Sequence, residues 1–203
     1  MRAGNMSGFP WLNASRMPQL IRYKAYHTNG SEPSSPSVRV RTPEGADVKA
    51  EDESLRKQLA AAFGTDVTLV RLDNGIFDDS PVSLISTTTL ATLETESGCG
   101  NLDARRFRPN VLIEPIGDAP VQEHAWVGKT VLVGNHANAP SLRVTAQDIR
   151  CVMVNLDPET AVAEPRILKT IARFSENCAG VYASVLNTGT LSVGEHLFVD
   201  EEH

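Results

Sequence analysis

Three arginines crowd a short segment directly before VLIE, an apolar stretch that is typical of a β-strand. They are Arg105, Arg106 and Arg108, and Pro109 and Asn110 follow the last of them. Side chains two residues apart share one face of an extended chain, so Arg108 and Asn110 are expected to point the same way. A guanidinium offers a planar fork of donors to a phosphate or another oxyanion, and a carboxamide adds a donor and an acceptor. The segment therefore predicts an anion site. The alternative is a solvated turn in which Arg106 or Arg108 pairs with nearby acids.

A second group of polar side chains lies where a strand is expected to end and a helix to begin. Ser86, Thr87 and Thr88 follow the apolar segment VSLI and precede a leucine pair at helical spacing. Backbone N–H groups at a helix N-terminus favour an anion, and hydroxyls add further donors. The same residues also suit simple helix capping, with Thr87 or Thr88 as the N-cap, and capping is the alternative interpretation.

A third group consists of Asp148 and Cys151, with Arg150 between them. A cysteine beside an arginine can be a reactive thiolate, whereas a buried and inert cysteine next to a valine-rich strand is the alternative. Asp148 suits a general base, a metal ligand or a turn residue. The five histidines are scattered and form no metal-binding spacing. The chain also lacks a GxSxG nucleophile motif, a GxGxxG motif and a Walker loop.

These residues must be positioned by many short strands and a few short helices. Alternating patterns predict strands at residues 19–26, 37–41, 67–72, 81–86, 110–114, 129–133, 142–147, 150–154, 182–186 and 196–199. Helical spacing predicts helices over about 52–63, from residue 87 or 88 onward, and over 167–174, and Pro158 suits the first turn of a short helix. The pattern favours an α+β fold, with a mostly antiparallel, barrel-like sheet and about three short helices. We expect one domain over residues 1–203, with a flexible loop at 28–37.

Composition and charge exclude several classes of protein. The 203 residues suffice for one domain with a real core. A net charge of −6 argues against non-specific nucleic-acid binding, which needs a positive surface. Three cysteines without CxxC spacing do not form a disulfide framework, and a reducing cytoplasm is the expected location. No apolar run is long enough to cross a membrane, and Met1–Phe9 does not read as a signal peptide.

Several of these segments together resemble one known family. In chain order, they are FDDSPVSLIS, STTTL, RRFRPNVLIE, RCVMVNLDPET and VYASVLNTGTLSVGEHLFV. This series is similar to the MOSC domain family, which includes the C-terminal domain of molybdenum-cofactor sulfurase and the mitochondrial amidoxime-reducing component. The resemblance spans residues 9–199. It implies a β-barrel-type fold that binds a molybdenum–pterin cofactor or carries sulfur for it, and pyridoxal phosphate binding is associated with the family only at a general level.

The resemblance also implies roles for individual residues. Arg108 and Asn110 match the arginine and asparagine that hold the cofactor's phosphate and pterin in the family's molybdenum reductases. Ser86 and Thr87 match hydroxyl residues that help at the end of a strand, and Arg16 matches an arginine ahead of an early proline. The implied activity is a two-electron reduction of N-hydroxylated substrates at the metal. A separate protein would donate the electrons, because no flavin or iron–sulfur motif is present.

One departure concerns the metal ligand. The resemblance places the metal-binding cysteine three residues before Cys151, where this chain has Asp148. Asp148 could bind molybdenum through its carboxylate, or its presence could record the loss of metal chemistry. Cys151 could replace the missing thiolate only if residues 148–151 form a loop, since a shift of three along a strand reverses the face. The alternatives to catalysis are a binding protein for an anionic pterin or a phosphorylated small ligand, and a carrier of sulfur as a persulfide on Cys151.

A second departure concerns the N-terminus. Family members of this type usually begin with strands that carry a Lys-Ser phosphate contact, and this chain starts beyond them. A missing strand would expose a sheet edge, and such an edge needs a cover or a partner strand. We therefore expect that the edge can be covered by homodimerisation.

Overall fold

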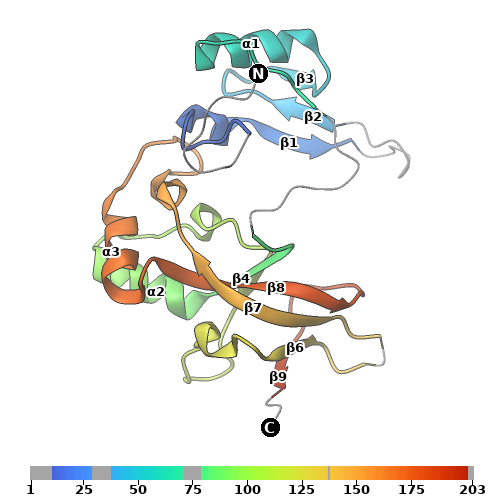
Figure 1. Cartoon of the computed structure of the whole chain (residues 1–203), viewed down its shortest axis with the longest axis vertical. Helices are drawn as coiled ribbons and strands as arrows, with labels where there is room; N and C mark the ends of the chain where they lie inside the picture. Colours follow the sequence, from blue (N-terminus) through green and yellow to red (C-terminus); the bar gives the residue numbers. More distant parts are fainter. Residues whose placement is uncertain (1–10, 29–37, 71–78, 137, 201–203) are drawn as a thin grey trace. The chain divides into compact units, whose positions relative to one another are not determined.

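The computed structural model describes residues 11–28, 38–70, 79–136 and 138–200. The internal contacts of the chain divide it into two compact units. The first comprises residues 1–75 and 156–163, and the second comprises residues 76–155 and 164–203. Figure 1 shows the helices and strands of both units. Among the described residues, no helix has the length and apolar character that crossing a membrane requires. Residues 1–10 and most of the predicted loop at 28–37 lie outside the described part.

The first unit contains a small antiparallel sheet and one helix. Its elements are the 3-10 helix η1 (Pro18–Arg22), the strands β1 (Lys24–His27), β2 (Val38–Arg41) and β3 (Asp47–Lys49), and the helix α1 (Glu53–Phe63). The predicted helix boundaries are confirmed, because Asp52 caps α1 and Gly64 ends it with a φ of 82°. Its core contains Met17, Val40, Leu55 and Leu59.

The second unit is built on a six-stranded sheet in the order β5-β4-β8-β7-β6-β9. The strands are β4 (Val82–Ser86), β5 (Val111–Ile113), β6 (Thr130–Val133), β7 (Ser141–Ile149), β8 (Cys178–Asn187) and β9 (Leu197–Asp200). Only β4 and β5 pair in parallel, and the other neighbours are antiparallel. Three register irregularities interrupt the long β7–β8 ladder, which curls in Figure 1. Bulges increase local twist, and the result is a half-barrel rather than a flat sheet.

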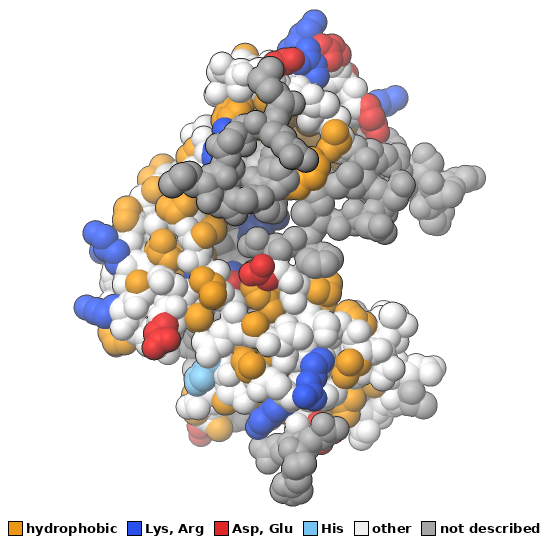
Figure 2. All heavy atoms as spheres, in the orientation of Figure 1, with side chains coloured by type: hydrophobic (Ala, Val, Ile, Leu, Met, Phe, Trp, Pro, Cys, Tyr) orange, Lys and Arg blue, Asp and Glu red, His pale blue; other side chains and the backbone are white. Residues whose placement is uncertain are grey.

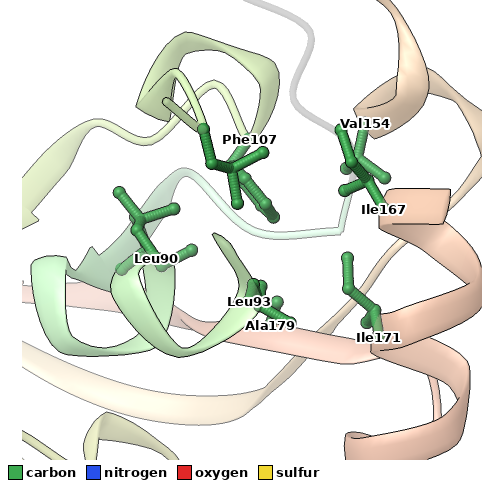
Figure 3. Packing of buried hydrophobic residues seen from close by; sticks show 9 residues of the cluster. Leu90, Leu93, Phe107, Val154, Ile167, Ile171 and Ala179 are labelled. Atoms are coloured by element: carbon green, nitrogen blue, oxygen red, sulfur yellow. The ribbon is translucent and has the colours of Figure 1, made fainter. Parts of the chain in front are cut away.

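Two helices pack on one face of this sheet. The helix α2 (Thr87–Ser97) joins β4 to its parallel neighbour β5, and α3 (Arg166–Ser175) precedes β8. In Figure 1 the two helices lie against each other, and Figure 3 shows their side chains meeting. The shared cluster contains Ile85, Leu90, Leu93, Leu102, Phe107, Val154, Ile167, Ile171 and Ala179. It is the apolar support beneath the segments that carry the candidate site.

The other face of the sheet has a core of its own. It contains Leu84, Ile113, Val131, Leu142, Val144, Val181 and Ala183. Successive residues of a strand point to opposite faces, so Leu84 and Ile85 of β4 enter different clusters. Both side chains are fully buried. The strand β4, which lies between β5 and β8, is therefore packed on both of its faces.

Short 3-10 helices complete the second unit. They are η2 (Ala104–Arg106), η3 (Glu123–Trp126) and η4 (Val152–Asn155). The α+β class and the three α-helices are confirmed, but the sheet is mixed, because the α2 crossover returns the chain parallel to β4. The predicted strand 150–154 is wrong. Its place is taken by η4, because β8 begins at Cys178 and offers no partner beyond Ile149.

Three smaller predictions also need correction. Residues 19–22 belong to η1 rather than to a strand, because Pro18 opens a helical turn there. Residues 67–70 pair with no strand in the described part of the chain, and residues 71–72 of that predicted strand lie outside it. Pro158 starts a turn instead of a helix, since the Asp157 carboxylate accepts hydrogen bonds from the backbone of residues 159 and 160.

Candidate functional site

The segment Phe107–Asn110 forms a turn that is anchored in the hydrophobic core by the ring of Phe107. Phe107 is 2% exposed, packs in the cluster between α2 and α3, and ends η2. Asp103 caps that helix by accepting a hydrogen bond from the Arg105 backbone. Arg108 follows with a φ of 52°, which is left-handed backbone that an arginine adopts only at a cost. Such strain persists only where the surroundings enforce it, and it is frequent at binding sites.

Asn110 attaches the far end of the turn to β4. Its backbone N–H donates to the Ser83 carbonyl at 2.9 Å. Its side-chain Oδ1 accepts from the backbone N–H of Ser83 at 2.8 Å and from the Ser83 hydroxyl at 3.2 Å. The carboxamide oxygen is thus committed to the protein, and the carboxamide Nδ2 is left as the donor on an exposed residue.

The three arginines of this segment have three different environments. Arg105 forms an exposed ion pair with Asp103 at 2.7 Å and lowers the pKa of that carboxyl. Arg106 donates to the backbone carbonyl of Asn155, the last residue of η4, at 2.9 Å. Arg108 is exposed, and within the described chain its guanidinium makes no hydrogen bond or ion pair. The alternative, in which Arg106 or Arg108 pairs with nearby acids, does not describe Arg108, which presents an available cation; the residue that pairs with an acid is Arg105.

Asp148 and Arg150 form an ion pair inside the protein. Their side chains are 2% and 8% exposed, and the Arg150 Nη2 lies 2.7 Å from the Asp148 Oδ2. Arg150 also donates from Nη1 to the Phe107 carbonyl at 2.8 Å and from Nε to the Ala179 carbonyl at 2.7 Å. Its guanidinium carbon lies 5.3 Å from the centre of the Phe107 ring. The carboxylate that the sequence offers as a metal ligand is therefore buried against a cation.

Gly180 makes room for this arrangement. The residue has a φ of 83°, and a Cβ there would lie 2.5 Å from the Leu84 carbonyl oxygen and 3.1 Å from the Arg150 Nη2. Only glycine gives β4 and the Arg150 guanidinium this close approach to β8.

Cys151 lies outside the strand that carries Asp148. β7 ends at Ile149, and the Arg150 backbone N–H donates to the Asn177 carbonyl at 2.7 Å. Residues 150 and 151 therefore form the loop between β7 and η4. Such a loop is required if Cys151 is to replace the cysteine that the resemblance places at position 148. Cys151 is exposed with a free thiol, whereas Cys178 is half-buried and burial raises its pKa. The accessible thiol is the one next to Arg150.

These segments correspond to one known family. The profile of the MOSC domain family matches residues 60–198, which include the turn at 107–110 and the loop at 150–151. This chain belongs to the MOSC domain family.

Two solved structures are similar to this MOSC domain. The YuaD protein from Bacillus subtilis is 14% identical, with a TM-score of 0.48, over 61% of this chain and 65% of that one. YiiM from Geobacillus stearothermophilus is 17% identical, with a TM-score of 0.46, over 61% of this chain and 55% of that one. The matched part spans less than two thirds of either protein's length. None of the curated proteins matches this chain.

The predicted anion site at the start of α2 holds a carboxylate of the MOSC domain itself. Glu123, in η3, is 1% exposed. Its carboxylate accepts from the Ser86 backbone N–H at 3.1 Å, from the Ser86 hydroxyl at 2.7 Å and from the Thr89 hydroxyl at 2.7 Å. The Ser86 oxygen also caps α2 by accepting from the Thr89 N–H, so the N-cap is Ser86 and the predicted cap at Thr87 or Thr88 is wrong. Ser86 is fully buried and committed to Glu123, while Thr87 is half-buried at the first turn.

Sequence reasoning did not identify Glu123 or the contact between Arg150 and Phe107. Glu123 lies 37 positions from its partner Ser86, and Arg150 lies 43 positions from Phe107. Neither has a local motif. The sequence hint that could have pointed to these contacts is the presence of polar side chains in otherwise apolar segments.

The remaining predicted residue lies in the other unit. Arg16 stacks on the ring of Phe63, with its guanidinium carbon 5.0 Å from the ring centre. Its predicted role toward the cofactor stays a prediction. Within the described part of the chain, no group of three or more His, Cys, Asp and Glu side chains is arranged to hold a metal ion. A polar hollow of about 620 Å³ lies between the loops after β6 and β8, and none of the predicted site residues lines it.

Proposed function

We propose that this MOSC domain binds a molybdenum–pterin cofactor, with Arg108 on the phosphate and the Cys151 thiolate on the metal. One observation carries the proposal. The side chain of Arg150 hydrogen-bonds the carbonyl of Phe107, so it ties the residue before Cys151 to the residue before Arg108. An available cation and an available thiol therefore come from adjoining segments.

The donor set fits this cofactor better through Cys151 than through Asp148. A thiolate is the form of cysteine that binds metals, and the Cys151 thiol is exposed and free. Asp148 could reach a metal only by leaving Arg150, and this would strand a buried guanidinium without its counter-charge. A metal that arrives already bound to a pterin needs few ligands from the protein, so a single thiolate is compatible with the absence of a ligand cluster in the described chain.

The phosphate of the cofactor is matched by the turn. Arg108 offers a planar fork, and charge-assisted hydrogen bonds to phosphate are among the stronger ones. Asn110 adds an outward amide donor whose orientation β4 fixes through Ser83. When bound, the cofactor supplies two-electron redox chemistry, such as removal of an oxygen atom from an N-hydroxylated substrate, with electrons from a separate donor. The residues of this chain bind and orient it.

Metal and pterin content test the proposal directly. The full chain is purified from a molybdenum-sufficient host that makes the cofactor, beside Cys151→Ser, Arg108→Ala and the control Cys178→Ser. We expect near-stoichiometric molybdenum and pterin in the wild type and in the control. Cys151→Ser should lose the metal, and Arg108→Ala should lose both. A wild type without either component would contradict the proposal, and a Cys151→Ser variant with full molybdenum would contradict the assigned ligand.

The exposed thiol also suits the carriage of sulfur, which is the second candidate. Mass spectrometry of the same preparations separates the two functions. A persulfide on Cys151 in protein that lacks molybdenum and pterin would support the sulfur carrier and overturn the cofactor proposal. An unmodified thiol in metal-loaded protein would exclude the carrier.

A further inference from the structure

Asp148 and Arg150 form a buried ion pair that makes no contact with the cofactor in the proposed function. The Asp148 side chain is 2% exposed and the Arg150 side chain is 8% exposed, so neither is accessible to a large ligand. Buried charges are retained where they are paired and where their other hydrogen-bonding groups are used. The contacts of Arg150 show what the pair does.

The three nitrogens of the Arg150 guanidinium contact two backbone carbonyls and one side-chain carboxylate. Nη1 contacts the carbonyl of Phe107 at 2.8 Å, Nε contacts the carbonyl of Ala179 in β8 at 2.7 Å, and Nη2 contacts Asp148 at 2.7 Å. The guanidinium also stacks on the Phe107 ring. The side chain therefore joins β8, β7 and the start of the Arg108 turn at one point.

Only a guanidinium can make this set of contacts. An ammonium is a point charge with no fixed fork, so it cannot reproduce two directed hydrogen bonds to the Phe107 and Ala179 carbonyls together with the ion pair to Asp148. Asp148 supplies the counter-charge that allows the guanidinium to stay buried, and it holds the third corner of the fork. The missing side chain of Gly180 allows this close approach, since a Cβ there would lie 2.5 Å from the Leu84 carbonyl oxygen and 3.1 Å from the Arg150 Nη2.

We propose that Asp148 and Arg150 are positioning residues that hold the Arg108 turn and the Cys151 loop in one fixed relation. Neither touches the ligand. Arg150 acts on the turn through the Phe107 carbonyl and on the loop because Cys151 is the next residue of the chain. Asp148 acts through Arg150. The expected effect on cofactor content rests on the proposed function. The effect on the order of the turn and the loop does not, and it can be measured without any cofactor.

The first test uses Arg150→Lys, which keeps the positive charge beside Asp148 and removes the fork. Native-state hydrogen exchange follows the amides of Phe107, Arg108 and Asn110 in the turn, and that of Val154, which donates to the Cys151 carbonyl and so reports on the loop. We expect their exchange to accelerate about ten-fold or more, and molybdenum and pterin content to fall by a similar factor, as is typical for residues that orient metal ligands. The amides of α2 and α3 should exchange at wild-type rates.

Arg166→Lys is the matched control. Arg166 belongs to the same unit and forms a two-point ion pair with Glu164, but the pair lies on the surface. Its conversion to lysine should leave exchange in both segments, and cofactor content, at wild-type values. A second variant, Asp148→Asn with Arg150→Gln, leaves no buried unpaired charge and covers the case in which Arg150→Lys does not fold. It should show the same local acceleration.

The outcomes separate this inference from the proposed function. Wild-type exchange at the turn and the loop in either variant would overturn the positioning role, as would equal acceleration throughout α2 and α3, because the pair would then serve general stability. A wild type without molybdenum and pterin, combined with the expected local acceleration, would overturn the cofactor proposal and leave the positioning role intact.

Discussion

Arg108 combines a strained backbone with a guanidinium that is free within the described chain. Its φ of 52° is a conformation that glycine adopts without strain. Arg108→Gly should therefore change the free energy of unfolding by no more than about 1 kcal/mol, in either direction, because relief of strain is offset by the greater freedom of the unfolded chain. Cofactor content should nevertheless fall as far as it does in Arg108→Ala. Urea denaturation and metal analysis of one preparation measure both quantities.

Arg105→Ala provides the comparison for that experiment. Arg105 lies three residues away and is already paired with Asp103 on the surface. Its loss should leave the cofactor content unchanged. If Arg105→Ala releases the cofactor while Arg108→Gly keeps it, the assignment of the phosphate to Arg108 is wrong.

At the residue scale, the sequence predicts what is local and misses what is distant. Arg108 and Asn110 were identifiable because they are near neighbours with complementary chemistry. The burial of Asp148 against Arg150 was not, because the spacing of the two residues does not reveal which faces of β7 are covered. The hydrogen bond from the Ser86 hydroxyl to Glu123 spans 37 residues of the chain, so no local pattern reveals it.

At the scale of the element, the packing of β8 against β4 requires glycine at position 180. Gly180→Ala places a Cβ 2.5 Å from the Leu84 carbonyl oxygen at a φ of 83°. We expect a loss of at least about 3 kcal/mol in the free energy of unfolding, from backbone strain and from overlap with β4 and Arg150. Denaturant unfolding measures it.

Gly194→Ala separates the two causes. Gly194 has a similar φ of 90°, but a Cβ there meets nothing within 4 Å. The substitution should cost only the backbone strain, about 1 kcal/mol. Equal losses at the two positions would show that the close approach of β8 to β4 has no energetic consequence.

The start of α2 depends on the buried carboxylate of Glu123. Glu123→Ala removes the acceptor of one backbone N–H and two hydroxyls in a buried site. Unsatisfied buried donors are costly, so a loss of about 3 kcal/mol in unfolding free energy is expected by thermal or urea denaturation. Glu96→Ala, on the exposed last turn of the same helix, is the control and should change stability little. Equal stability of both variants would contradict the structural role of Glu123.

The start of α3 should show a pH dependence. The hydrogen-bonded Arg166 guanidinium lowers the pKa of Glu164 from 4.5 to about 2. A carboxyl with a depressed folded-state pKa contributes stability above its unfolded pKa and loses it as the pH falls toward the folded value. The stability difference between wild type and Glu164→Gln should therefore be constant near pH 6 and shrink between about pH 4.5 and pH 2. Because the pair is exposed, added salt should reduce it. A difference that does not vary with pH would refute this.

At the element scale, caps and turns were easier to predict than strand pairing. Asp52 and Gly64 determine the ends of α1 through contacts within a few residues. The apolar run at 150–154 has the composition of a strand, but it lies beyond the start of its potential partner β8 and folds as η4. Because β7 ends at Ile149, Cys151 lies in a loop, as its proposed role as a metal ligand requires.

At the scale of the whole molecule, family membership could be predicted from the order of the segments. The profile match over residues 60–198 confirms it. The chain has a net charge of −6, yet it presents a local positive charge at Arg108. Arg105 is paired with Asp103 and Arg106 is bound to the Asn155 carbonyl, whereas the Arg108 guanidinium has no such partner in the described chain. On the face drawn in Figure 2, Lys and Arg side chains occur in small separate groups among hydrophobic and uncharged ones. Local geometry rather than total charge therefore supports anion binding.

The most direct test of this account is the molybdenum-to-protein and pterin-to-protein ratio of the full chain from a cofactor-producing host, measured for the wild type and for Cys151→Ser. We predict both components near stoichiometry in the wild type, and loss of the metal when the Cys151 thiol is removed. Wild-type protein without molybdenum and pterin, or metal that stays bound after Cys151→Ser, would contradict it.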